Sequence, residues 1–255
     1  MMLSGKKIVI IGGSGGIGLA AVKAFIDQGA KVMYTGLEAA PAENLPGSFY
    51  LQSNSTHKDA LHQVIQSAHR TWGKIDGWYH IAGGSGRKHG DGPLHAVTEE
   101  GWAYTLTLNL TSVMLSNQAI IQYWLDHRCG GTILNTGSVL AAHPAPHLFA
   151  THAYAAAKAG IEGFSKSIAA YYAKDNIRIN VLAPGLIATN MSLRAQTDQT
   201  ILDYIRLKQP LDGGRIGSPE DVVGAALYFM SDLSRFVTGQ VIGVDGGWSV
   251  SEGGG

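Results

Sequence analysis

The stretch that decides the fold reads Gly12-Gly13-Ser14-Gly15-Gly16-Ile17-Gly18 and joins two segments of different character. Lys7–Ile11, before it, is an apolar, β-branched run typical of a buried strand, and Leu19–Phe25, after it, has the composition of a helix. A strand that turns sharply into a helix presents unpaired N–H groups and the positive end of the helix dipole, and glycine lets a phosphate approach the backbone. The turn therefore predicts a dinucleotide site in a βαβ unit.

The spacing of the glycines narrows this prediction. Gly12, Gly16 and Gly18 do not follow the G-x-G-x-x-G order of the standard dinucleotide fingerprint. The turn also lacks the Lys-Ser/Thr pair that ends the phosphate loop of nucleoside-triphosphate enzymes. Kinase or ATPase chemistry is therefore disfavoured.

Composition excludes several other classes of protein. The 255 residues include 34 glycines, about twice the ordinary share of roughly 7%, but there is no G-X-Y period and only 8 prolines, which excludes collagen. Hydrophobic residues make up 45% and charged residues 15%, enough for a large core. Positive and negative charges balance at 19 each, which disfavours nucleic acid as a partner. Cys129 is the single cysteine, which excludes an intrachain disulfide and a thiolate metal cluster, and we expect no metal site.

Apolar runs alternate with longer amphipathic stretches along the whole chain, the pattern of a parallel sheet with helices on both faces. We expect a single doubly wound Rossmann-type α/β domain over residues 1–255, with a substrate-loop region near 186–215 and a flexible tail at 249–255. The predicted strands are Lys7–Ile11, Lys31–Thr35, Ser48–Gln52, Asp76–Ile81, Thr132–Thr136, Ile177–Ala183 and Gln240–Val244. The predicted helices are 16–28, 57–72, 99–127, 152–175, 198–209 and 219–231.

Tyr154 and Lys158 are a candidate proton-transfer pair. They lie four positions apart in an alanine-rich stretch, so a helix projects both from one face. A phenol loses its proton near pH 10, and an adjacent ammonium lowers that pKa toward the working range. The spacing alone is equally compatible with a surface pair on an ordinary helix, so the interpretation depends on other residues.

Ser138 supplies that support. It lies just past the carboxyl end of the strand Thr132–Thr136, at the sheet edge where open α/β proteins place their ligands, and the glycine turn and Ala82-Gly83 follow their strands at the same edge. Together, the glycine turn, Tyr-x3-Lys and this serine resemble the short-chain dehydrogenase/reductase family over nearly the whole chain.

The resemblance implies four catalytic residues. Tyr154 is implied as the general acid/base, Lys158 as the group that lowers its pKa and holds the nicotinamide ribose, and Ser138 as the hydroxyl that orients the substrate oxygen. Asn109 matches the helix asparagine that supports a proton-relay water. The implied cofactor contacts are Gly12, Ser14, Gly15, Gly16, Ile17, Gly18, Gly36, Leu37, Asn54, Ala82, Gly83, Asn109, Tyr154, Lys158, Pro184, Gly185, Ile187 and Thr189.

The choice between NAD and NADP depends on the end of the second strand. An acidic side chain there binds the ribose 2′-OH of NAD, and a basic one favours the 2′-phosphate of NADP. Gly36 and Leu37 carry neither charge, while Glu38 is close enough to accept from the ribose and repel a phosphate. NAD is slightly favoured.

Four residues, at three places in the chain, depart from the family pattern. Ile11 replaces a threonine before the first glycine, His80-Ile81 replaces Asn-Asn before Ala82-Gly83, and Asn54 replaces an aspartate. Each departure removes a local hydrogen bond and leaves the proton chemistry intact.

The substrate is expected between Ser138, Tyr154 and the loops at 84–95, 140–150 and 186–200. Ser138 and Tyr154 are 16 positions apart, longer than is usual in the family, and the extra residues, 143–149, are predicted to shape the pocket. The candidate substrate contacts are Ser138, Leu140, His147, Tyr154 and Leu186. Arg87 and Lys88 are candidates for a carboxylate, with a solvated loop tip as the alternative.

The predicted function is an NAD(P)-dependent oxidoreductase that transfers a hydride between the nicotinamide and a secondary alcohol or ketone. The alternative within this class is an NADPH-dependent carbonyl or 3-oxoacyl reductase, although no basic patch for an acyl carrier is evident. A non-catalytic dinucleotide-binding sensor is disfavoured because the serine, tyrosine and lysine are all present. No apolar run reaches the ~18 residues of a membrane helix, so we expect a cytoplasmic protein that acts on a small molecule. The family resemblance and the apolar helices 99–127 and 152–175 indicate a homo-oligomer, a dimer or tetramer, in which these helices pack between subunits.

Overall fold

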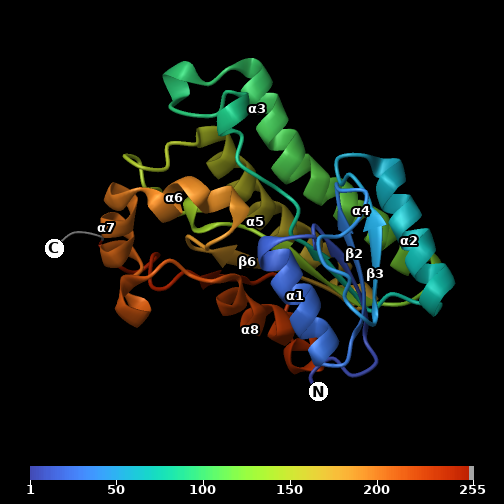
Figure 1. The fold of residues 1–255 in the computed structure, drawn as a ribbon. Helices are drawn as coiled ribbons and strands as arrows, with labels where there is room; N and C mark the ends of the chain where they lie inside the picture. Colours follow the sequence, from blue (N-terminus) through green and yellow to red (C-terminus); the bar gives the residue numbers. More distant parts are fainter. Residues whose placement is uncertain (253–255) are drawn as a thin grey trace.

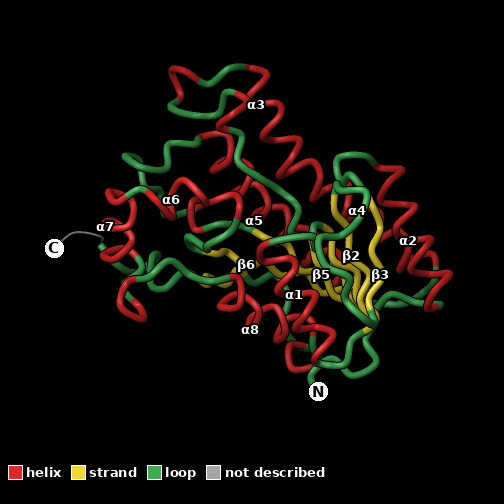
Figure 2. The backbone as a smooth tube through the Cα atoms, in the orientation of Figure 1, coloured by secondary structure: helices red, strands yellow, loops and turns green. Residues whose placement is uncertain are grey.

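A seven-stranded parallel sheet forms the centre of the molecule (Figures 1 and 2). The computed structural model describes residues 1–252. The strand order is β3-β2-β1-β4-β5-β6-β7. The strands are β1 (Lys7–Ile11), β2 (Lys31–Gly36), β3 (Ser48–Gln52), β4 (Gly77–His80), β5 (Gly131–Thr136), β6 (Ile177–Pro184) and β7 (Val241–Val244). The predicted doubly wound α/β fold is confirmed, and no strand end lies more than one residue from its predicted position.

Helices cover both faces of this sheet, which is why its strands are apolar on both sides. On one face α1 (Gly16–Asp27) packs beside α8 (Pro219–Met230), as Figure 1 shows. On the other face lie α2 (Lys58–Trp72), α4 (Ser112–Asp126) and α5 (His152–Tyr172). The remaining helices are α3 (Glu99–Leu106), α6 (Leu193–Thr197) and α7 (Gln199–Lys208).

The predicted helix 99–127 is correct in extent but not regular. A π-helical turn, Thr107–Thr111, separates α3 from α4 and contains Asn109. Such turns widen the helix by one residue and occur often at functional sites. The short helix α6 was not predicted, because its five residues fall below the length at which periodicity is readable.

The order of the strands creates a crevice at their carboxyl ends. The chain moves outward from β1 through β2 to β3 and then returns to place β4 on the opposite side of β1. Loops leaving β1 and β4 therefore diverge, and ligands of open α/β sheets bind at this point. The glycine turn follows β1, and Ala82-Gly83 follows β4.

Hydrogen bonds join the residues near the chain end to earlier parts of the molecule. Trp248 is buried, and its indole N–H donates to the carbonyl of His143 at 3.1 Å. Ser251 donates its hydroxyl to the carbonyl of Lys208 at 2.8 Å. Within the predicted flexible tail 249–255, Ser251 is thus joined to α7, while residues 253–255 lie outside the described part. No helix among the described residues is long and apolar enough to cross a membrane.

Candidate active site

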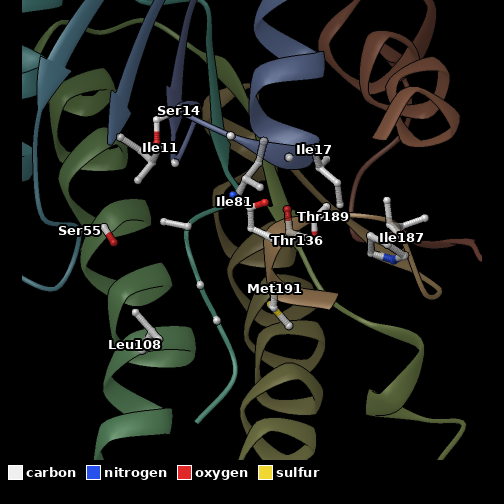
Figure 3. A pocket seen from close by; sticks show the side chains of 18 of the residues that line it. Ile11, Ser14, Ile17, Ser55, Ile81, Leu108, Thr136, Ile187, Thr189 and Met191 are labelled. Carbon is white, nitrogen blue, oxygen red and sulfur yellow. The ribbon is translucent and has the colours of Figure 1, made fainter. Parts of the chain in front are cut away.

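A cavity of about 410 Å³ opens at the carboxyl edge of the sheet (Figure 3). Figure 3 shows Ser55 and Leu108 on one side of it and Ile17 and Ile187 on the other. The predicted residues that line it are Gly12, Ser14, Gly15, Gly16, Ile17, Gly36, Leu37, Asn54, Ala82, Gly83, Ser138, Tyr154, Lys158, Pro184, Gly185, Leu186, Ile187 and Thr189. Gly18, Asn109, Leu140 and His147 were also predicted and do not line it.

The glycine turn is closely packed. Gly12 has a φ of +87°, and a Cβ there would lie 2.6 Å from the backbone nitrogen of Ala82. A Cβ on Gly18 would collide with the carbonyl oxygen of Gly12, so Gly18 serves the approach of α1 to the turn although it does not face the cavity. No side chain caps the N-terminus of α1. This backbone cradle and its open helix N-terminus fit a pyrophosphate.

Thr35 provides the hydroxyl that holds the glycine turn, since position 11 is isoleucine and supplies none. The Gly12 N–H donates to the Thr35 hydroxyl at 3.2 Å, and the Gly13 N–H donates to the Thr35 carbonyl at 2.8 Å. The hydroxyl on β2 therefore anchors the turn, and the loss of a threonine at position 11 leaves no gap in this network.

Glu38 bends back over the end of β2. A Cβ on Gly36 would lie 2.6 Å from Glu38 Oε2 and 2.5 Å from the Ser14 hydroxyl oxygen. Because Gly36 has no side chain, the Glu38 carboxylate and the Ser14 hydroxyl can both approach it at the mouth of the glycine turn. Glu38 also lines the cavity. Its carboxylate therefore supplies a negative charge at the end of β2, where Gly36 and Leu37 carry none.

Lys158 is buried at the centre of the site. Its ammonium donates to the carbonyl of Thr136 at 2.8 Å and lies 5.5 Å from the centre of the Tyr154 ring. Burial lowers the pKa of Lys158 to about 8. The group is still mainly protonated at neutral pH, so burial weakens the ammonium without removing its charge.

The Tyr154 phenol differs from the sequence-based expectation. Burial raises its pKa to about 12, and the neighbouring Ser138 hydroxyl acts in the opposite direction. In the protein alone, the cost of removing a phenolate from water outweighs the attraction of the nearby lysine. These residues alone therefore do not lower the pKa of Tyr154, contrary to the sequence-based prediction.

Asn109 fastens the loop after β4. Its amide donates to the carbonyls of Gly84 and Thr105, both at 2.9 Å, and its Oδ1 accepts from the Gly84 N–H at 3.0 Å. The π-helical turn around Asn109 makes this reach possible. The side chain is thus fully occupied as a brace for the cavity wall at Gly83 and Gly84.

His80 replaces an asparagine of the family pattern and remains a brace. Its Nε2 lies 3.1 Å from the carbonyl of Ala82, and this acceptor requires the proton on Nε2. Burial, followed by the charge of Lys158, lowers the pKa of His80 to about 3. A neutral imidazole therefore supports the turn at Ala82.

Comparisons with known proteins agree with this geometry. A family model described as enoyl-(acyl carrier protein) reductase matches residues 12–249. The 3-oxoacyl-[acyl-carrier-protein] reductase FabG of Thermotoga maritima is 35% identical, with 97% of this chain and 99% of that protein covered. Gluconate 5-dehydrogenase of Gluconobacter oxydans is 31% identical, with 98% and 96% covered. A short chain dehydrogenase from Leptospira borgpetersenii, solved with bound NAD+, is similar with a TM-score of 0.87 at 29% identity, covering 98% and 94%.

The chain belongs to the short-chain dehydrogenase/reductase family. The predicted family and fold are confirmed, and the protein is an NAD(P)-dependent oxidoreductase, as the sequence predicted. This family membership also fits the donor set of the cavity, where a backbone cradle lies at one end and a hydroxyl, a phenol and an ammonium lie at the other.

The substrate side of this dehydrogenase/reductase differs from the prediction at two positions. Leu140 packs against an apolar cluster around Trp248, and His147 is exposed, so neither faces the cavity. The cause is the tryptophan, which draws the segment 143–149 onto itself. Cavity-lining residues missing from the predicted site set are Ile11, Thr35, Glu38, Ser53, Ser55, Ile81, Gly84, Leu108, Thr136, Gly137, Asn190, Met191 and Ser192. The position of Leu108 beside Asn109 was a signal that could have found it.

Asp91 is a further residue of the site that the sequence did not reveal. Its buried carboxylate accepts from the N–H groups of Ala153 and Tyr154, both at 3.0 Å. These residues lie in the first turn of α5, and the residue that precedes this helix, Thr151, provides no side-chain cap. Asp91 therefore caps the helix that carries Tyr154 and Lys158 from a loop more than 60 positions away in the sequence.

Proposed function

We propose that this protein is an NAD-preferring oxidoreductase that interconverts a secondary alcohol and a ketone, with Tyr154 as the proton-transfer group. The observation that carries the proposal is the arrangement of one cavity, which is lined by the glycine turn and by Ser138, Tyr154 and Lys158. When bound, the dinucleotide supplies hydride transfer, and the protein supplies orientation and electrostatics.

The proposed roles follow from the surroundings of each side chain. Ser138 and Tyr154 both line the cavity and supply the hydroxyl groups that hold the substrate oxygen. Lys158 is anchored on the Thr136 carbonyl, so its position beside Tyr154 is set before any ligand enters. Its ammonium favours the phenolate during proton transfer. Tyr154 is thereby able to pass a proton to or from the substrate oxygen.

The NAD preference is supported by the charges near the end of β2. Glu38 Oε2 lies beside Gly36 and Ser14 and lines the cavity, whereas Lys158, the cation among the described lining residues, belongs to the Tyr154 end. A carboxylate accepts from the ribose hydroxyls of NAD and repels the 2′-phosphate of NADP. Because Gly36 and Leu37 are neutral, Glu38 is the charged residue that decides between NAD and NADP.

A 3-oxoacyl reductase remains the second candidate. It is supported by the relatives of that name, of which the Thermotoga maritima protein is 35% identical over nearly all of both chains. The apolar Leu186 and Met191 in the cavity wall suit an acyl chain. Activity on a 3-oxoacyl thioester with NADPH above that with any free alcohol would favour this candidate.

The assembly is proposed to be a homo-oligomer, a dimer or homotetramer, in the cytoplasm. Large apolar side chains are exposed on the helices predicted to pack between subunits, namely Trp102, Tyr104, Met114, Leu125 and Tyr171. Analytical ultracentrifugation of the full chain tests this, and a monomer at micromolar concentration would contradict it.

The test of the proposed chemistry is Tyr154→Phe. We expect turnover to fall by at least about 100-fold, since general acid/base catalysis contributes that much or more. Reduced nicotinamide is followed by absorbance, with both dinucleotides, against polyols, hydroxy acids, sterols and cyclic alcohols. The dissociation constant for NAD should stay within about twofold because the ring remains. Substantial turnover in the variant would overturn the role of Tyr154.

A further inference from the structure

Two arginines from separate segments, each within three residues of a cavity-lining residue, share one hydrogen-bond acceptor. Arg87 begins the 3-10 turn Arg87–His89, three residues after the cavity-lining Gly84, and Arg194 lies in α6, two residues after the cavity-lining Ser192. The Nη2 atoms of both donate to one acceptor, the carbonyl oxygen of Leu148, at 3.3 and 3.1 Å. Leu148 belongs to the segment that joins Ser138 to Tyr154. The two guanidinium groups therefore lie close to each other and to this segment.

The carboxylates near this pair are engaged elsewhere. Asp91 is close enough to act on Arg87, but its two oxygens accept from the Ala153 and Tyr154 N–H groups. Asp198 Oδ2 lies 3.8 Å from Arg194 Nη1, at the outer limit of an ion pair, while its Oδ1 caps α7. Burial, followed by the charge of Arg194, lowers the pKa of Arg87. The pair thus holds two like charges whose repulsion is only partly balanced.

The pair also has hydrogen-bond donors to spare. A guanidinium carries five N–H donors, and the Leu148 carbonyl takes one from each arginine. The Arg194 side chain keeps 53% of its surface exposed, so a ligand can reach it. The planar fork of arginine matches the geometry of a carboxylate or a phosphate. Binding the single Leu148 carbonyl oxygen does not explain why two guanidinium groups lie together here.

We propose that Arg87 and Arg194 together bind an oxyanion of the substrate, the carboxylate of a hydroxy or oxo acid or the phosphate of a phosphorylated alcohol, while its carbinol carbon lies at Tyr154. This rests on the proposed function and narrows its substrate class from any secondary alcohol to an anionic one. The neutral overall charge of the chain makes such a local pair more selective, because no general positive field competes with it.

Matched substrates test the proposal by turnover. The pairs are 3-hydroxybutyrate with its methyl ester and glycerol 3-phosphate with glycerol, and the proteins are the wild type, Arg87→Gln/Arg194→Gln and Arg206→Gln. The control removes an exposed charge of α7 that makes no side-chain hydrogen bond among the described residues and does not line the cavity. We expect wild type to favour the anionic member, and the double variant to lose this preference in kcat/KM by at least about tenfold, since charge-assisted hydrogen bonds are the strong ones.

The neutral members and Arg206→Gln should keep wild-type behaviour within about twofold. The carboxylate pair and the phosphate pair distinguish the two sources of the oxyanion. An equal preference in wild type and double variant would overturn the proposal, because the arginines then only fasten loops to Leu148. Glutamine keeps a donor for that carbonyl, and thermal unfolding checks that the variant is folded.

A binding measurement separates this proposal from the proposed function. Glutarate and inorganic phosphate are titrated by calorimetry into the full-length protein saturated with NAD. We expect at least one to bind the wild type and to bind the double variant at least about tenfold more weakly. Equal binding, or none to the wild type, would overturn the arginine site even where a neutral alcohol is turned over. Binding that depends on the arginines without turnover of any alcohol or ketone would instead contradict the proposed function.

Discussion

The two halves of the cavity are built by different means. The nucleotide half is built mostly of backbone. Neighbouring atoms lie so close to Gly12, Gly18 and Gly36 that a Cβ at any of these positions would collide with them. The substrate half is made of side chains on loops, and long-range hydrogen bonds from Asp91, Arg87 and Arg194 hold these loops in place. One half is fixed by the sheet, and the other is fixed by a few removable contacts.

The difference reflects what each half binds. A dinucleotide presents the same pyrophosphate to every member of the family, so a rigid cradle at the end of β1 serves it. Substrates differ, and loops on a rigid scaffold accept changes at little cost to the fold. We therefore expect substitutions in the nucleotide half to affect cofactor affinity and stability together, and those in the substrate half to affect turnover alone.

Gly18→Ala should give the largest effect, because it breaks the backbone-built half. The new Cβ collides with the Gly12 carbonyl, a backbone atom that cannot move without opening the turn. We expect the dissociation constant for NAD to rise at least about 100-fold, which corresponds to about 2.8 kcal/mol. Fluorescence titration measures the affinity, and denaturant unfolding measures the stability.

The matched control is Gly224→Ala in α8, where a Cβ meets nothing within 4 Å. Alanine in a helix interior is favoured over glycine, so the free energy of unfolding should rise by up to ~1 kcal/mol with unchanged affinity. If Gly18→Ala bound NAD like the wild type, the proposed rigidity of this half would be wrong.

The same contrast explains what could be predicted from the sequence. The glycine turn is readable because its strand, turn and helix are contiguous, and the spacing of Tyr154 and Lys158 is readable because one helix carries both. The sheet followed from alternating apolar runs, since each buried strand must be apolar on both faces.

The substrate half was less predictable because its contacts join distant positions. Asp91 meets Ala153 across 62 positions, and Arg194 meets Leu148 across 46. No local pattern marks such a pair. His147 was placed in the pocket from its position in the loop, but Trp248, about 100 residues further along, draws that loop away.

Asp91→Ala should disturb the side-chain-built half with an intermediate effect. It leaves two N–H groups at the start of α5 without an acceptor and frees the helix that carries Tyr154. We expect kcat/KM to fall roughly tenfold to 100-fold, since small displacements of a reacting group are costly, with the dissociation constant for NAD within about twofold.

Asp91→Asn should recover part of this loss, because its amide oxygen still accepts one N–H. Ser218→Ala is the control, since it removes a cap from α8 on the opposite face of the sheet. Its cost should be limited to stability, typically about 1 kcal/mol. A parallel loss of NAD affinity in Asp91→Ala would show that the two halves are not independent.

Glu38→Gln should give the smallest effect, because it changes a charge at the edge of the nucleotide half and leaves the backbone intact. Glu38 is exposed, so water weakens its repulsion of a 2′-phosphate, and we expect the ratio of NADP to NAD affinity to rise only about threefold to tenfold. Glu43→Gln is the control, because it removes an equal charge that pairs with Lys23 outside the cavity. Calorimetric titration with both dinucleotides measures the ratio. If the wild type prefers NADP, or if the ratio of NADP to NAD affinity is unchanged in Glu38→Gln, the proposed role of Glu38 is wrong and the backbone sets the choice of cofactor as well.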